Sequence, residues 1–239
     1  MNNTLYIVVP CYNEEEVLGE TASRLKVKMH SLITEDMISR DSRILFVNDG
    51  SKDGTWAMIR DLCAADRLFA GVSLSRNRGH QNALLAGLMT ARGRADMVIS
   101  MDADLQDDIN AVDQMIDEYS GGADVVYGVR NKRDKDTFFK RLTAEGYYKL
   151  LEAMGCQVVF NHADYRLLSA RALDALSEYG EQNMFIRGII PMLGFKTSAV
   201  TYERGERFAG ESKYPLKKML KLAFDGIYSL SLKPVRFIT

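Results

Sequence analysis

The sequence predicts an α/β fold: a Rossmann-like, mostly parallel sheet with helices on both faces, followed by a C-terminal amphipathic helical appendage. Three observations predict it. Short apolar, β-branched runs alternate with longer amphipathic runs through the first half of the chain. One of these runs, ADMVISMDAD at residues 95–104, contains a continuous apolar stretch, as a parallel strand covered on both faces does. Polar or turn-forming residues follow each apolar run, as they do where strands end.

The elements of the first half follow from these patterns in order. Strands are predicted within residues 5–10, 43–51, 69–77, 95–104 and 123–130. Helices are predicted within residues 13–32, 54–65, 81–93 and 109–122. Acidic residues in the first turn of the first predicted helix interact favourably with the helix dipole. Gly93 is a residue typical of helix C-termini and ends the third predicted helix.

The second half is less regular. It predicts an aromatic and basic helix at 136–155, a loop or short strand followed by a helix at 161–180, and short strands with turns at 188–214. A basic, apolar helix is predicted from residue 215 to the end. Since no internal repeat or linker is evident, we expect one domain at 1–210 and a C-terminal helical appendage at 211–239.

Composition narrows the class of protein. The 239 residues are 46% hydrophobic and 26% charged, which is ordinary for a soluble globular chain. The net charge of −1 gives no reason to expect a nucleic-acid partner. The three cysteines lack the spacing of a zinc site or disulfide framework and indicate reduced thiols in the cytosol. We expect no signal peptide. Because the sequence contains no run of about 18 apolar residues, it predicts no membrane-spanning helix.

A functional site is expected at one edge of the sheet. Ligands of such sheets bind beyond the carboxyl ends of the strands, where the polar residues that end the predicted strands converge. These residues are Asn13 and Glu14, 48–51, 76–80, 102–108 and 128–130.

The acid cluster Asp102, Asp104, Asp107 and Asp108 allows three interpretations. A calcium loop is disfavoured, because the required glycine and distal glutamate are missing. Helix capping explains Asp107 and Asp108 but leaves Asp102 and Asp104 unexplained. A divalent cation, held by one or two carboxylates and a substrate diphosphate, explains the acids that directly follow a buried strand.

Two other strand ends indicate a nucleotide. Pro10, Tyr12, Asn13 and Glu14 follow the first strand and are suited to flank a flat base and accept its hydrogen bonds. Asp49 follows the second strand, where an acid commonly binds a ribose or base edge; a simple turn at Asp-Gly explains it equally well. No dinucleotide-binding or P-loop glycine motif is present.

The ordered motifs resemble the family-two inverting glycosyltransferases of the GT-A fold. They are VVPCYNEEE, VNDGSKDGT, SRNRGHQNALLAG, MDADLQDD and VVYGVR. More narrowly, DYRLLS and GESKYPLKKMLKLAFDGIYSLSLKP resemble the polyisoprenyl-phosphate branch, which includes bactoprenol glucosyltransferases and dolichol-phosphate mannose synthases. One departure is DDIN, where that branch usually has proline after the acids; we expect only a local effect on the loop.

The resemblance implies a nucleotide-sugar donor and a metal. It places Pro10, Tyr12, Glu14 and Asp49 at the nucleoside, Asp102 at the nucleotide or sugar, and Asp104 with Gln106 at Mg²⁺ or Mn²⁺. Two further groups of residues are expected to contact the phosphates or the sugar: His80 and Gln81 at a helix start, and Arg207 and Lys213 in a glycine-flanked segment suited to close over the diphosphate.

The resemblance also implies a lipid-phosphate acceptor, which needs positively charged side chains to bind its phosphate more than it needs a general base. Arg130 ends a strand and is the first candidate for such a phosphate contact. Arg141, with Lys140, is a second candidate, unless both lie on a solvated helix face. Asp164 is expected near the reactive sugar carbon, as base or orienting group, or else in an ion pair with Arg166.

The C-terminal segment is basic and apolar, as a helix lying on an anionic bilayer is. Relatives in the branch usually continue into hydrophobic spans, so we expect a catalytic domain on the cytoplasmic face of the cell membrane. The expected reaction transfers glucose from UDP-glucose to undecaprenyl phosphate. GDP-mannose as donor, a soluble transferase that extends a glycan, and a sugar-nucleotide binding module without turnover are the alternatives. A homo-oligomer is left open.

Overall fold

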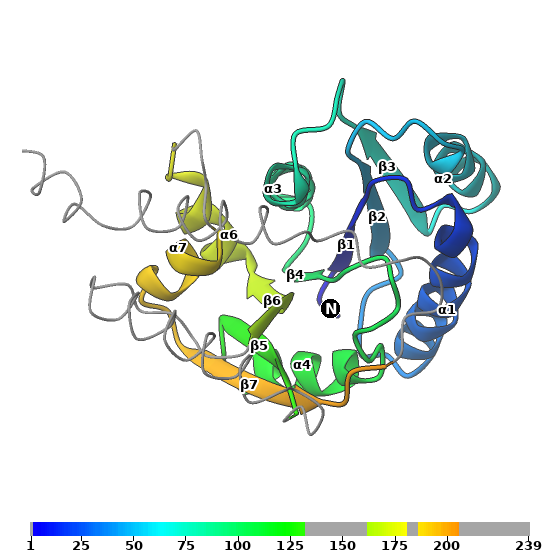
Figure 1. The fold of residues 1–239 in the computed structure, drawn as a ribbon. Coiled ribbons are helices and arrows are strands. Elements are labelled where there is room, and N and C mark those ends of the chain that lie inside the picture. Colours follow the sequence, from blue (N-terminus) through cyan, green and yellow to red (C-terminus); the bar gives the residue numbers. More distant parts are fainter. Residues whose placement is uncertain (1, 132–161, 181–185, 206–239) are drawn as a thin grey trace, which may run out of the picture.

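A computed structural model describes residues 2–131, 162–180 and 186–205. Its seven-stranded sheet has the order β3-β2-β1-β4-β6-β5-β7 (Figure 1). The strands are β1 (Leu5–Cys11), β2 (Arg43–Asn48), β3 (Phe69–Ser73), β4 (Met97–Ser100), β5 (Val125–Arg130), β6 (His162–Ser169) and β7 (Thr197–Tyr202). The helices are α1 (Glu15–Thr34), α2 (Thr55–Ala65), α3 (His80–Ala91), α4 (Ala111–Ser120), α6 (Ala170–Ser177) and α7 (Ile186–Met192).

The sheet is mostly parallel, as predicted, and β6 is its exception. β1 pairs in parallel with β2 and β4, β2 with β3, and β5 with β7. β6 lies between β4 and β5 and runs antiparallel to both. Because its direction is reversed, the first residues of β6 lie at the same edge of the sheet as the carboxyl ends of the other strands.

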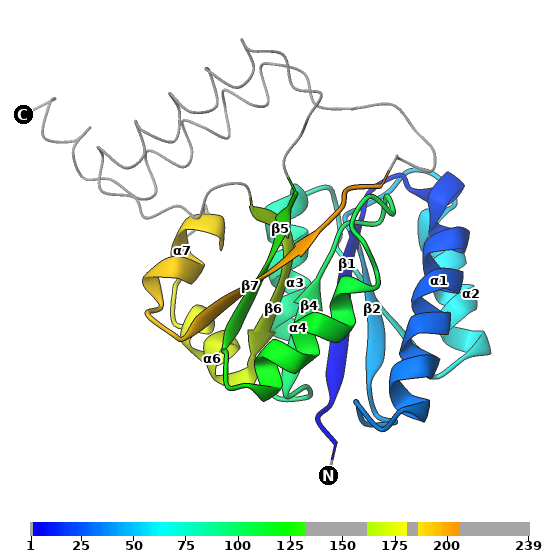
Figure 2. The same ribbon diagram turned by 90° about the horizontal axis from the view of Figure 1, so that it is seen from below.

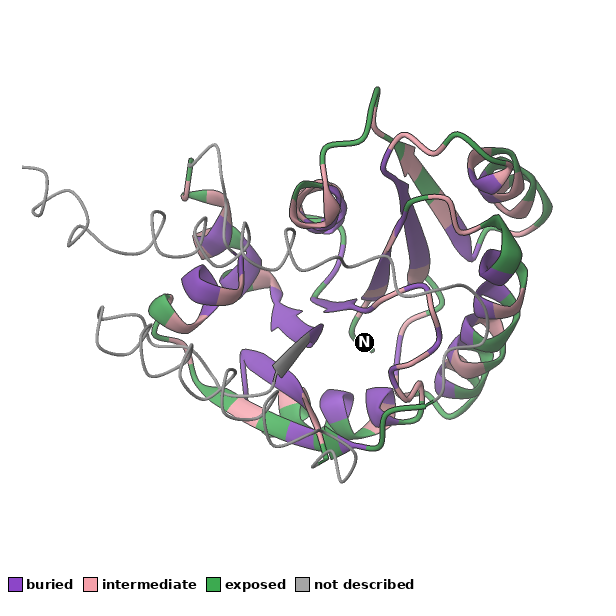
Figure 3. Ribbon diagram, viewed as in Figure 1, coloured by how far each residue is buried: buried purple, intermediate pink, exposed green. Residues whose placement is uncertain are grey.

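Helices cover both faces of the sheet (Figure 2). Alternate residues of β1 show the reason: Ile7 and Val9 belong to one apolar cluster, and Val8 belongs to the other. The first cluster holds buried side chains of α1, α2 and α4, and the second holds those of α3, α6 and α7. Figure 3 shows buried residues alternating with more exposed ones along the helices of both layers. The predicted layering is confirmed.

The second half departs from the sequence prediction in two places. Strands and turns were expected over 188–214, but α7 is a helix, in which Ile186, Ile189 and Ile190 form one buried stripe at helical spacing. Pro191 lies in the last turn of α7. β6, for which a loop or short strand was expected, is a full strand inside the sheet. β7 agrees with the prediction.

Two predicted helices, at 136–155 and from residue 215 onward, lie outside the described residues, so the division at residue 210 stays a prediction. Among the residues that are described, none of the helices combines the length and the hydrophobicity that crossing a bilayer requires.

Candidate active site

The loops after β1 and β2 are held together at the rim of the sheet. Asn13 has a positive φ of 54° and joins the two loops through both its backbone and its side chain. Its N–H donates to Ser51 Oγ at 3.0 Å, and its Oδ1 accepts from the Lys52 N–H at 2.9 Å. The Glu14 N–H donates to Thr55 Oγ1 at 2.9 Å. Pro10 is half-buried beside them and Tyr12 is 37% exposed, so an aromatic ring is available at this rim.

Asp49 is buried and closes the loop that leads into α3. Its Oδ1 accepts from the Arg78 N–H at 2.6 Å, and its Oδ2 accepts from the Gly79 N–H at 2.9 Å. Gly50, with φ of +64°, lies so close to this loop that a Cβ would meet the Arg76 carbonyl carbon at 2.5 Å. The acid therefore shapes the rim, and its predicted contact with a ribose or base stays a prediction.

The four acids after β4 have different surroundings. Asp107 is buried and pairs with Arg130 and with the Tyr202 hydroxyl, so the predicted helix-capping role is wrong for it. The cap of α4 is instead Asn110, whose N–H donates to Asp108 Oδ1 at 2.9 Å. The Asp102 side chain is partly exposed. Partial desolvation of its carboxylate, opposed by His80 and reinforced by nearby carboxylates, raises the pKa of Asp102.

The predicted metal ligands fit a hard cation in part. Asp104 Oδ1 accepts from the Gln106 N–H at 3.2 Å, in a turn that contains Leu105 with a φ of 58°. The side-chain oxygen of Gln106 accepts from Arg204 and would have to exchange that partner for a metal. Within the described ranges, no three His, Cys, Asp or Glu side chains converge as a metal cluster. Asp102 and Asp104 suit a cation held by few carboxylates and completed by a diphosphate.

Asp164 lies at the start of β6 and is surrounded by donors. Arg187 contacts both its oxygens, Nε to Oδ1 at 2.9 Å and Nη2 to Oδ2 at 2.8 Å. His80 Nε2 lies 3.2 Å from Oδ2 and Gln81 Nε2 lies 3.3 Å from it. Arg166 Nη2 donates to Oδ1, so the alternative ion pair considered from the sequence is present. Sequence reasoning missed Arg187, because nothing in FIRGII marks this arginine as a partner of an acid 23 residues earlier.

Arg130 is at the carboxyl end of β5, as predicted, and its side chain is already engaged. Its Nη2 lies 3.1 Å from Asp107 Oδ1, and its Nε donates to the Tyr202 hydroxyl at 3.1 Å. The charge of Arg130 is thus matched by a buried carboxylate. The role of Arg130 in binding the acceptor phosphate stays a prediction. Arg141, Lys140, Arg207 and Lys213 lie outside the described residues.

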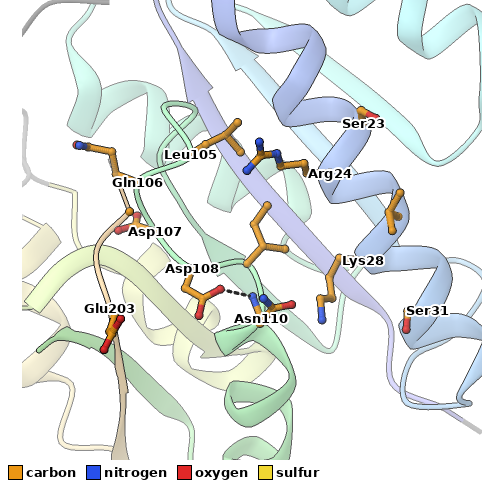
Figure 4. Close-up of a pocket in the computed structure, with 13 residues that line it drawn as sticks. Ser23, Arg24, Lys28, Ser31, Leu105, Gln106, Asp107, Asp108, Asn110 and Glu203 are labelled. Atoms are coloured by element: carbon orange, nitrogen blue, oxygen red, sulfur yellow. Dashed lines mark hydrogen bonds between the residues drawn. The ribbon is translucent and has the colours of Figure 1, made fainter. Parts of the chain in front are cut away.

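A cleft of about 540 Å³ lies between α1 and the β4–α4 loop (Figure 4). Arg24 and Lys28 of α1 line one wall, and residues 105–110 line the other. Its lining includes Gln106 but none of Asp49, Asp102 and Asp164. The cleft therefore borders the acid loop but does not include Asp49, Asp102 or Asp164.

Comparisons with known proteins show which sequences this chain is similar to. A family model described as "Glycosyl transferase family 2" matches residues 6–177. The uncharacterized glycosyltransferase YkoT of Bacillus subtilis is 54% identical over 98% of this chain and 70% of its own. The prophage bactoprenol glucosyl transferase homolog of Escherichia coli is 38% identical over 98% of this chain and 74% of its own.

Solved structures share the fold. Glucosyl-3-phosphoglycerate synthase from Mycobacterium tuberculosis, in complex with Mn²⁺, UDP and phosphoglyceric acid, aligns with a TM-score of 0.60 at 16% identity. The alignment covers 95% of this chain and 77% of that one. The solved structures thus show that this chain has the GT-A fold. The family match and the relatives go one step further: this chain belongs to glycosyl transferase family 2.

Proposed function

We propose that the protein transfers glucose from UDP-glucose to a polyisoprenyl phosphate such as undecaprenyl phosphate, with inversion and with Mg²⁺ or Mn²⁺. The observation that carries the proposal is the pair Asp102 and Asp104 at the rim, directly after the buried strand β4. Relatives at 37–38% identity named as bactoprenol glucosyl transferases or homologs support the donor sugar and the acceptor.

The donor half of the site is formed by the loops after β1, β2 and β4. Tyr12 and Pro10 would flank the base, and Asn13, Glu14 and Asp49 would shape or bind the nucleoside end. Asp104 and Gln106 would hold the metal, which supplies positive charge against the departing nucleoside diphosphate. Gln81, and Arg207 and Lys213 from the segment beyond residue 205, are proposed contacts of the diphosphate or sugar.

The acceptor requires positioning more than activation. A phosphate monoester is an anion near neutral pH, so its oxygen attacks the anomeric carbon without a strong base. The new C–O bond forms as the bond to the diphosphate oxygen breaks, and an α-linked donor gives a β-linked product. Arg130 and Arg141 are the proposed cationic contacts of the acceptor phosphate.

Asp164 acts in this scheme as an orienting group. Although burial alone raises the pKa of Asp164, the hydrogen bond from His80 and the charges of Arg187 and Arg166 hold it well below its ordinary value. A carboxylate with so low a pKa is a weak base, and the anionic acceptor has little need of one. The base role considered from the sequence is therefore the less favoured of the two.

The acceptor implies a membrane surface, and we propose that residues 211–239 bring the catalytic domain to its cytoplasmic face. The basic, apolar composition of this segment supports the proposal. A soluble transferase that extends a glycan would need neither this segment nor a lipid phosphate.

A donor panel tests the function. Radiolabelled UDP-glucose, other UDP-sugars and GDP-mannose are each incubated with undecaprenyl phosphate and Mn²⁺, and label is measured after extraction into organic solvent. We expect label from UDP-glucose, and we expect Asp104→Ala to reduce it by at least about a hundredfold because charge on the leaving group is then unmatched. Asp113→Ala, which removes a surface acid paired with Lys28, is the matched control. If only GDP-mannose gave labelled lipid, the donor would be GDP-mannose instead of UDP-glucose. Full activity of Asp104→Ala would show that Asp104 does not hold the metal.

A further inference from the structure

The surroundings of Asp164 combine the starts of three elements. Asp164 is the third residue of β6, His80 and Gln81 are the first two residues of α3, and Arg187 is the second residue of α7. The reversed direction of β6 brings its start to the rim, and the packing of α3 and α7 on the same face of the sheet brings their first turns beside it. One carboxylate therefore connects three elements at the edge where the candidate substrates bind.

The contacts use the full accepting capacity of this carboxylate. An ionised carboxylate offers about four lone-pair positions. Arg166 and Arg187 donate to Oδ1, and His80, Gln81 and Arg187 lie within hydrogen-bond reach of Oδ2. Asp164 is thus a centre that positions its neighbours, with little capacity left to accept a proton from a substrate.

Exposure separates the inner members of this group from the outer ones. The side chains of Asp164 and Arg166 are 6% and 1% exposed, whereas those of Arg187 and His80 are 34% and 36% exposed. The two outer groups are held by the inner carboxylate and face the rim, where His80 also lies 3.8 Å from Asp102. A paired contact such as that of Arg187 fixes direction as well as distance, which a single hydrogen bond does not.

We propose that Arg187 is a positioning residue, whose paired contact fixes the Asp164 carboxylate and, through it, His80 at the rim of the active site. The inference rests on the proposed function for its consequence in catalysis, but the positioning itself is independent of which donor is used. Arg187 acts through Asp164 and His80, and its loss should misplace both relative to the substrates.

The test follows the ring nitrogens of His80 by NMR in the full chain without substrates. The chain has three histidines, which makes assignment simple. Arg187→Lys keeps the positive charge beside Asp164 but cannot form the paired contact. If that contact fixes Asp164, the hydrogen bond between Asp164 and His80 should weaken in Arg187→Lys, and Asp164→Asn should weaken it as well.

Weakening of this hydrogen bond while the charge at residue 187 is kept is the outcome that a merely electrostatic or structural role does not produce. Arg92→Lys is the matched control, since it changes an arginine of an exposed ion pair with Asp174 at the other end of α3, and should leave the His80 signals unchanged. Arg187→Ala, which also removes the charge, should weaken the hydrogen bond at least as much as Arg187→Lys does. An unchanged hydrogen bond between His80 and Asp164 in Arg187→Lys would overturn the proposal.

Activity provides the second arm. With the donor that the panel identifies, Arg187→Ala should lower kcat/KM by about a hundredfold, as expected for misplaced catalytic groups, and Arg187→Lys should restore part of it. Wild-type activity in Arg187→Ala would refute the role in catalysis. If no donor is active with the wild type, the proposed function fails, while the NMR result still decides the positioning.

Discussion

At the scale of single residues, buried carboxylates organise the polar interior of this protein. Asp49, Asp107, Asp124 and Asp164 are all buried, and each meets donors from a different part of the chain. Because an unpaired buried charge is costly, each of these acids makes its partner segment take one position. In three of the four cases that segment borders the rim, so the same ion pairs that stabilise the fold also shape the site.

Asp124, the one outside the rim, allows a clean test of stability. Its Oδ1 accepts from Ser169 Oγ at 2.9 Å, and Arg171 contacts both its oxygens. The hydrogen bonds from Arg171 lower the pKa of Asp124 below its ordinary value. The stabilisation is therefore present above the unfolded pKa of about 4 and is lost as the pH falls towards the lower pKa of the folded state.

We expect Asp124→Asn to lower the melting temperature by a few degrees at neutral pH, and by less as the pH approaches about 3. Thermal unfolding followed by circular dichroism across this pH range measures the difference. Asp174→Asn, at an exposed ion pair, is the control and should change little. A difference that stays constant with pH would show that the charge of Asp124 contributes nothing.

At the scale of elements, the contact of α3 with the sheet decides where the rim groups lie. Gly87 faces β1 and β2 so closely that a Cβ would lie 2.3 Å from Val8 Cγ1 and 2.8 Å from Val47 Cγ2. The absence of a side chain there lets α3 approach the sheet, and the approach sets the position of His80 and Gln81 at its first turn.

Gly87→Val should therefore reduce the free energy of unfolding by about 3 kcal/mol, the upper part of the range for overpacked cores. Urea denaturation measures it. Ala86→Val places the same side chain at a half-buried position of the same helix and should cost far less. Equal losses in the two variants would mean that helix propensity, rather than close packing, is the cause.

At the scale of the whole molecule, a donor bound at the rim would contact loops that follow three strands of the sheet. Since binding would require the folded arrangement of these loops, the donor should stabilise the entire fold. If the metal binds together with the diphosphate, as predicted, the donor should stabilise the fold only when the cation is present.

We expect UDP with Mn²⁺ to raise the melting temperature, in line with about 2.7 kcal/mol at a hundredfold excess over Kd. Chelation with EDTA, or Asp104→Ala, should remove the increase. Differential scanning fluorimetry with UDP, GDP and ADP as separate arms measures it. Stabilisation by GDP alone would indicate another donor, and an equal effect with EDTA would contradict the role of the metal.

The order and type of the elements from β1 to β5 could be predicted from the sequence, because the period of a strand or helix is a local property. Asp102 and Asp104 could be predicted as well, since acids directly after an apolar strand stand out, whereas Asp164 was singled out by the family resemblance. The reversed direction of β6, the pairing of Arg130 with Asp107 and the contact of Arg187 with Asp164 became evident only in the folded structure. These depend on strand pairing and packing between distant segments, which no local pattern encodes.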